Sequence, residues 1–109
     1  MSTPEPGLDL HEWESEFSSI EPDFEDDPAG ALVELTNLVG RMLTARGFAV
    51  DDPVADDGEE PEILATFRAA REVSRLVESD ADVDPGDVAS AINDLRDVYD
   101  HLIIERAPP

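Results

Sequence analysis

The segment DPAGALVELTNLVGRMLTARG, residues 27–47, carries a helix with both of its ends marked. Asp27 can cap free backbone amides, Pro28 suits the first helical position, and Gly47 suits a left-handed C-cap. A helix over about residues 28–46 is therefore predicted. At about 100° per residue, its apolar side chains form an arc wide enough to touch two neighbours, so we expect a core helix. The arc consists of Ala31, Leu32, Leu35, Leu38, Val39, Met42, Leu43 and Ala45.

Two more amphipathic segments follow it along the chain. The acidic stretch 51–60 contains Asp-Pro and Asp-Gly steps that favour turns, and it predicts a linker. A helix over about 61–78 is predicted after this linker. The next helix, over about 85–105, repeats the earlier start, with Asp84 as the cap and Pro85 as the first helical residue. Apolar residues recur at helical spacing in both segments, so each is expected to bury one face.

A shorter amphipathic helix is predicted over about residues 9–20, in the segment HEWESEFSSIEPDFEDDP. The large apolar residues of this segment are Trp13, Phe17, Ile20 and Phe24, and they follow one another at steps of four, three and four residues. An isolated helix of this length is marginal in water, so it must dock on something. Either it closes an apolar seam left by the other three helices, which is the favoured hypothesis, or it lies in the groove of a partner.

The fold class that follows is all-α, a small bundle of three long helices (about 28–46, 61–78 and 85–105) plus the shorter N-terminal helix (about 9–20). A chain of 109 residues is long enough for one domain, which we expect over 9–106, with a flexible tail at 1–8 and another at 107–109. Without cysteine, stability must come from packing. No apolar run approaches the roughly 18 residues that cross a bilayer, and the first residues lack a signal-peptide pattern, so a cytoplasmic location is expected.

The charge is the most unusual global property of the sequence. There are 28 acidic residues against 7 basic ones, all arginine, which gives a formal charge of -21. Such a surface repels nucleic-acid phosphates and anionic lipids, so direct nucleic-acid binding and membrane binding are not expected. It suits a partner protein with a basic surface. The alternative is that the acidity and the lack of lysine reflect a GC-rich or halophilic host and serve only solubility.

No residue pattern in the sequence indicates catalysis, a cofactor or a metal. Asp97 and His101 are four residues apart and could both reach one metal ion, but they point away from the apolar face of their helix. The linker around Asp57 lacks the full calcium-loop pattern. Neither histidine has a serine or cysteine arranged beside it for nucleophilic catalysis. The chain is therefore predicted not to be an enzyme, with no catalytic, cofactor-binding or metal-binding residues.

The function predicted from these features is a non-enzymatic interaction or regulatory module that binds a basic surface of a partner protein. Alternatives are a structural helical homodimer and an inhibitor of the antitoxin, immunity-protein or nucleic-acid-mimic type. Arginines on one flank of the 61–78 helix either pair with carboxylates of neighbouring helices or contact an anion or a partner. The candidate partner-binding residues are Trp13, Phe17, Ile20, Arg68, Arg71, Arg75 and Ile104.

Overall fold

Helices make up most of the chain that the structure describes, a computed structural model covering residues 6–48 and 62–106, with side chains at 11–48 and 62–103. No strand occurs in these ranges, and four of the helices pack together, so the prediction of a small all-α bundle is confirmed. The helices are α1 (Pro6–Ile20), α2 (Asp23–Asp26), α3 (Pro28–Ala45), α4 (Glu62–Glu78) and α5 (Pro85–Arg106).

The starts of α3 and α5 follow the Asp-Pro pattern seen in the sequence. The side chain of Asp27 accepts a hydrogen bond from the Gly30 N–H at 3.2 Å, and Asp84 accepts one from the Gly86 N–H at 2.8 Å. Each carboxylate satisfies an amide that has no partner inside its helix, and its charge complements the positive end of the helix dipole. The caps therefore fix where both helices begin.

The ends of α3 and α4 share one turn geometry. Gly47 follows α3 with a φ of 93°, and the Phe48 N–H donates to the Leu43 carbonyl at 3.0 Å. After α4, Asp80 has a φ of 62°, and the Ala81 N–H donates to the Leu76 carbonyl at 3.0 Å. Both are Schellman motifs, in which one left-handed residue reverses the chain and satisfies the last carbonyls.

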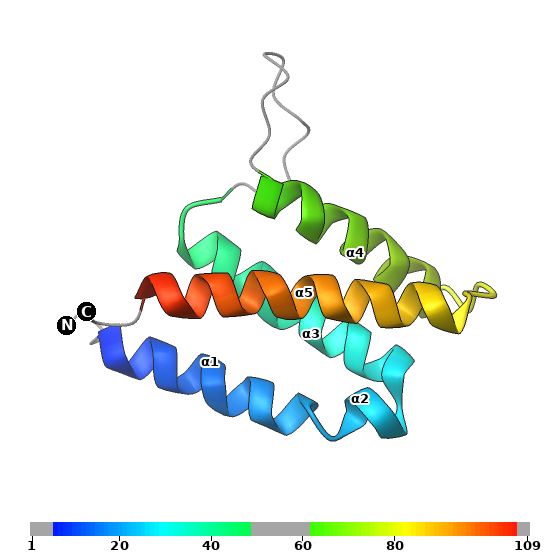
Figure 1. Ribbon diagram of the computed structural model, residues 1–109, viewed down its shortest axis with the longest axis horizontal. Coiled ribbons are helices and arrows are strands. Elements are labelled where there is room, and N and C mark those ends of the chain that lie inside the picture. The colour runs from blue at the N-terminus through cyan, green and yellow to red at the C-terminus, as the bar shows by residue number, and fades with distance from the viewer. Residues whose placement is uncertain (1–5, 49–61, 107–109) are drawn as a thin grey trace, which may run out of the picture.

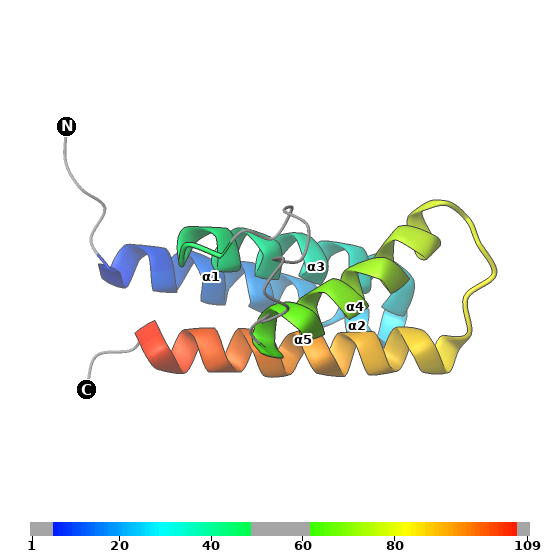
Figure 2. The same ribbon diagram turned by 90° about the horizontal axis from the view of Figure 1, so that it is seen from above.

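The four long helices run alternately up and down, and both ends of the described chain lie at the same end of the bundle (Figure 1). Helices α3 and α5 contact each other and form the middle of the bundle. Helix α1 packs against both from one side, and α4 packs against both from the other, inclined to α5 in the second view (Figure 2). Helix α3 is thereby enclosed by all of its neighbours.

The core is built around α3. Its wide apolar arc is fully buried from Ala31 to Leu43, as the sequence predicts for a helix that touches more than one neighbour, whereas Ala45, predicted to belong to the arc, is exposed at the helix end. Helix α5 supplies as many buried apolar residues as α3, and the buried residues of α4 and α1 complete the core. The fully buried residues of α3 are Ala31, Leu32, Leu35, Leu38, Val39, Met42 and Leu43.

The N-terminal region differs from the prediction in two ways. Helix α1 begins at Pro6, so residues 6–8 are helical where a flexible tail was predicted; proline is well suited to a first helical position. A one-turn helix, α2, forms between Pro22 and Asp27, and it is too short to give a periodic signal. The remaining parts of the predicted tails and the linker 51–60 lie outside the described residues.

Within the two described ranges, none of the helices combines the length and the apolar character that crossing a bilayer requires.

The two left-handed positions give opposite expectations for substitution. Gly47→Ala should lower the free energy of unfolding by about 1 kcal/mol, because a Cβ is strained at positive φ although no atom lies within 4 Å of it. Asp80→Gly should raise it by about 0.5–1 kcal/mol for the same reason. Urea unfolding followed by circular dichroism measures both, with the denaturant slope expected to stay constant. Changes of the same sign in the two variants would contradict the assignment.

Candidate functional site

The aromatic stripe of the N-terminal segment packs against this chain's own helices. Ile20 is 4% exposed and belongs to the core, and Trp13 is half-buried against it. The ring of Phe17 stacks on Tyr99 of α5 at 4.1 Å between centroids and 16° between planes, and Phe24 meets Phe17 edge-on at 5.8 Å. The structure thus places three of the candidate partner-binding residues, Trp13, Phe17 and Ile20, against the chain's own helices. This arrangement corresponds to the favoured of the two docking hypotheses.

The seam between α1 and α5 lies in a strongly negative environment. Burial, followed by the negative charges of Glu14, Asp100 and Glu21, raises the pKa of Tyr99 from its ordinary value near 10 to about 12. Both effects disfavour the tyrosinate form. The hydroxyl of Tyr99 therefore reports the negative potential that the outer acids of the two helices create.

An acidic groove of about 540 Å³ runs between α4 and α5. We call it the α4–α5 groove. Its apolar floor is formed by the half-buried Ile63 and the buried Val98, and its rim carries the exposed carboxylates of Glu62, Asp94 and Asp97. Among the described residues, none of these three carboxylates takes part in a hydrogen bond or an ion pair. Thr66 and His101 complete the lining.

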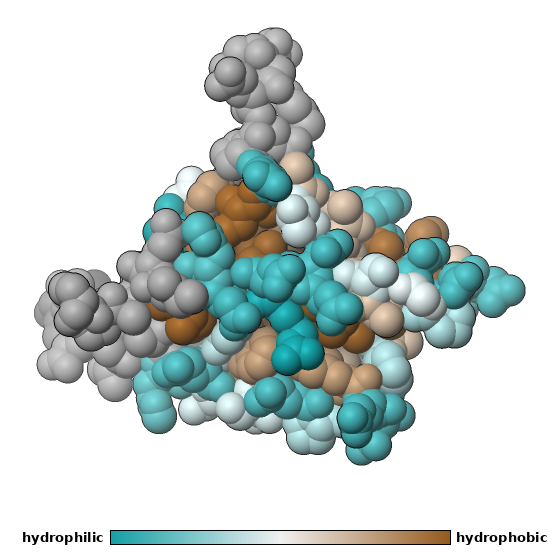
Figure 3. Space-filling view, viewed as in Figure 1, coloured by the Kyte–Doolittle hydropathy of each residue, from teal (hydrophilic) through white to brown (hydrophobic). Residues whose placement is uncertain are grey.

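The space-filling view shows the face of the molecule on which α5 lies. Hydrophilic residues form a band across the centre of this face, and apolar residues appear on either side of the band (Figure 3). The polar band follows the outward side of α5, where Asp94, Asp97 and Asp100 are exposed. Carboxylates on this face therefore flank apolar surface.

Asp97 and His101 share the α4–α5 groove, as their spacing on one helix requires. Within the described ranges, however, no three side chains of histidine, cysteine, aspartate or glutamate come close enough together to hold a metal ion.

Two arginines of the predicted stripe, Arg71 and Arg75, lie on the α3 side of α4. Arg71 places its guanidinium 5.3 Å from the centre of the Phe67 ring, a cation–π contact. Arg75 pairs with Glu72 of the same helix at 3.8 Å, and both side chains are exposed. Arg68 is half-buried. The side chain of Ile104, the remaining candidate, lies outside the described part of the structure, although its backbone belongs to α5.

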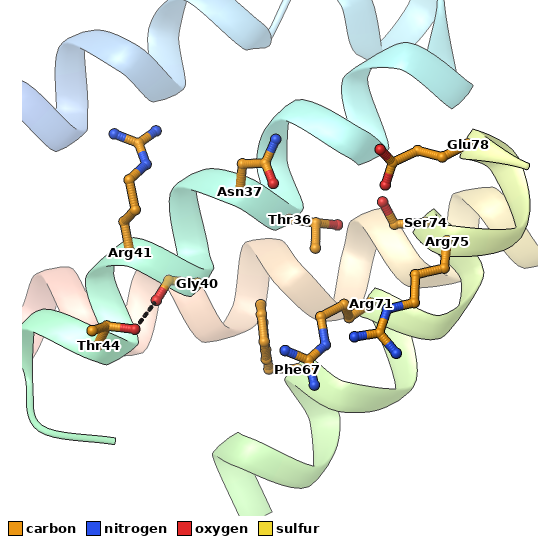
Figure 4. Close-up of a pocket in the computed structure, with 10 residues that line it drawn as sticks. All are labelled: Thr36, Asn37, Gly40, Arg41, Thr44, Phe67, Arg71, Ser74, Arg75 and Glu78. Atoms are coloured by element: carbon orange, nitrogen blue, oxygen red, sulfur yellow. Dashed lines mark hydrogen bonds between the residues drawn. The ribbon is translucent and has the colours of Figure 1, made fainter. Parts of the chain in front are cut away.

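A second groove, of about 450 Å³, separates α3 from α4 on this side (Figure 4). We call it the α3–α4 groove. Gly40 allows the Phe67 ring to lie against α3, because a Cβ at this position would come within 3.2 Å of the ring. The guanidinium groups of Arg71 and Arg75 extend from successive turns of α4, whereas Arg41 turns away toward α1 and pairs with Glu16. The remaining lining residues are Thr36, Asn37, Thr44, Ser74 and Glu78.

The sequence singled out the arginines of this groove but not its small polar residues. Thr36, Gly40 and Ser74 follow the helical spacing of core positions, and each could be read as a tolerated small residue in a packed seam. One feature of the sequence indicates that Ser74 belongs with the arginines: Phe67, Arg71 and Ser74 follow one another at steps of four and three residues, which places them on one face of α4.

The chain matches no protein-family model, and the comparisons with curated proteins and with solved structures give no match either.

The raised pKa of Tyr99 predicts a loss of stability in alkaline solution. Between pH 10 and 12 the unfolded chain releases the tyrosine proton while the folded chain keeps it, so the free energy of unfolding should fall as the pH rises. The slope should reach at most about 1.4 kcal/mol per pH unit. Chemical unfolding at a series of pH values measures it.

The composition of the chain allows the alkaline change in stability to be assigned to Tyr99 alone. With one tyrosine, no cysteine and no lysine in the chain, no other side chain except arginine titrates above pH 9. Tyr99→Phe is the matched control, because it keeps the ring stacked on Phe17 and removes the titrating hydroxyl. An equal slope in the wild type and in Tyr99→Phe would contradict the assignment.

Proposed function

We propose that this chain is a non-enzymatic interaction module that binds a basic surface of a partner protein through the α4–α5 groove. The observation that carries the proposal is the set of rim carboxylates, Glu62, Asp94 and Asp97, which have no ion-pair or hydrogen-bond partner among the described residues. They surround the apolar floor made by Ile63 and Val98. An apolar centre with a charged rim is the usual anatomy of a protein interface.

The overall charge supports a basic partner. At -21, the chain repels itself and any acidic protein, whereas a basic surface is attracted over distances up to the Debye length, about 8 Å at physiological salt. The rim charges should mainly raise the association rate and select the partner, and the apolar floor should slow dissociation. Binding is accordingly expected to weaken steeply as salt is added.

The shape of the groove favours an amphipathic segment of the partner. Two packed helices with an apolar floor between them can accept a third helix, whose apolar residues lie on the floor and whose lysine or arginine residues reach the rim. Inhibition of a basic nuclease or DNA-binding protein, as by an antitoxin, an immunity protein or a nucleic-acid mimic, is a special case of this proposal.

The alternative of a structural homodimer has less support. Leu76 of α4, at 44%, is the only large hydrophobic residue among the described ones that is exposed, so this part of the chain offers little apolar surface for a second copy. Two copies would also bring two charges of -21 together.

Light scattering at low and physiological salt distinguishes these hypotheses, because the interaction-module proposal expects a monomer at both.

The test of the groove uses a synthetic amphipathic peptide of leucine and arginine as the probe. Replacing both Asp94 and Asp97 by asparagine should weaken binding by roughly twofold to thirtyfold, from about 0.2–1 kcal/mol per exposed ion pair. Fluorescence anisotropy at several salt concentrations measures the affinity and its salt dependence. The double variant should also show a smaller salt dependence, because fewer charges contribute.

The matched control is the double replacement of Glu25→Gln and Asp26→Asn on α2, which removes two exposed charges outside the groove. Its affinity should change less than that of the groove variant. Equal losses in the two double variants would show that only the net charge matters, and binding unaffected by salt would remove the electrostatic argument altogether.

A further inference from the structure

The α3–α4 groove, on the other flank of α4, has a chemistry opposite to that of the acidic groove. One wall is a stripe of small and polar residues of α3, with Thr36, Gly40 and Thr44 on successive turns. The other wall belongs to α4. Its residues follow one another at steps of four, three and four along the same helix face: Phe67, Arg71, Ser74 and Glu78, with Arg75 beside them.

Ser74 is the most informative residue of this groove. It is only 2% exposed, and within the described part of the chain its hydroxyl makes no hydrogen bond. The hydroxyl points into the space between the two helices (Figure 4). By contrast, the hydroxyls of Thr36 and Thr44 donate to the carbonyls of Leu32 and Gly40 in their own helix. The Ser74 oxygen is not one of the fully enclosed polar atoms of the described chain, so the hydroxyl is open to the groove and can donate to a ligand there.

The arginines beside Ser74 give the groove its positive character. Arg71 places its guanidinium 5.3 Å from the centre of the Phe67 ring, and this cation–π contact holds the positive charge beside the groove floor. The pair between Arg75 and Glu72 is exposed and long, at 3.8 Å, so it can be exchanged for a better anion at small cost. Arginine suits planar, bidentate recognition of carboxylate and phosphate groups.

We propose that the α3–α4 groove binds the phosphate or carboxylate group of a small organic molecule, with Arg71 and Arg75 as charged donors and Ser74 as a neutral donor. The volume, about 450 Å³, falls in the range of small-molecule sites, roughly 300–1,000 Å³. The apolar part of the ligand would lie against Phe67 and the bare backbone of Gly40. This site is separate from the proposed basic-partner surface and does not depend on it.

Glu78 sets the limit on the charge of the ligand. Its carboxylate lines the same groove and would repel an anion, so two arginines are opposed by one acid. The net local charge is positive but small, and the rest of the surface is strongly negative. A molecule with one anionic group is therefore favoured over a polyanion such as a nucleic acid.

The experiment titrates the full chain with phenyl phosphate, benzoate, inorganic phosphate or acetate, and follows backbone and arginine side-chain resonances by NMR at low salt. Saturable shifts are expected at Ser74, Arg71 and Gly40 with phenyl phosphate and benzoate. Inorganic phosphate and acetate, which lack the aromatic ring, should bind more weakly. The phosphate and carboxylate arms decide which headgroup the site prefers. Benzyl alcohol, which lacks the charge, should not give saturable shifts.

Variants distinguish a built site from general attraction to arginine. Arg71→Gln should weaken binding at least about tenfold, and Ser74→Ala about fivefold. Glu78→Gln should strengthen binding, because it removes the opposing charge. Circular dichroism checks that each variant keeps its helix content. Arg75→Gln should also weaken binding, and because Arg75 is exposed this replacement should not disturb folding.

The matched control is Arg96→Gln on α5. Arg96 lies over the ring of Phe24 at 5.3 Å, the same distance as Arg71 from Phe67, but it belongs to a different surface. Its replacement should leave the affinity unchanged within about twofold. The proposal is overturned by the absence of saturable shifts in the α3–α4 groove, by an equal loss in Arg96→Gln and Arg71→Gln, or by binding that Glu78→Gln weakens.

Discussion

Burial of the wide apolar arc of α3 is the constraint on which the rest of the structure depends. A single neighbour covers only a stripe of a helix, and the buried arc of α3 extends from Ala31 to Leu43. Helices α4 and α5 cover part of it, and α1 with α2 must cover the remainder. Covering the remainder of the arc places Phe17 and Ile20 inside the bundle. The aromatic stripe that could have served a partner is consequently a structural element of this chain.

The same constraint distributes the charges. Since the apolar faces of all helices turn inward, the carboxylates occupy the outer faces, and their field reaches the hydroxyl of Tyr99. Helix α4 carries both signs of charge. Its flank toward α5 carries carboxylates at the rim of one groove, and its flank toward α3 carries arginines in another. Opposite chemistries thus lie about one helix diameter apart.

Much of the fold could be predicted from the sequence because its signals are local. Asp27, Pro28 and Gly47 act within their own helix, and the apolar period of α3 needs no knowledge of its neighbours. The one-turn helix α2 could not be predicted, because four residues give no period. The sites were harder still. A mid-helix glycine such as Gly40, which costs about 1 kcal/mol relative to alanine, indicates a close approach without saying of what, and the structure shows a phenylalanine ring there. Whether Ser74 has a hydrogen-bond partner depends on α3, which lies far from it in the sequence.

A compositional origin of the acidity accounts for how many charges there are, but not for where they lie. A GC-rich or halophilic bias replaces lysine by arginine and adds acids throughout a chain, without regard to helix face. Yet three of the seven arginines stand on one flank of α4, and Arg71 and Arg75 line a groove that also holds the Ser74 side chain. Charges placed only for solubility would be expected to spread over the surface. Their segregation on the two flanks of one helix is the positional feature that composition leaves unexplained, and it is the feature that binding would require.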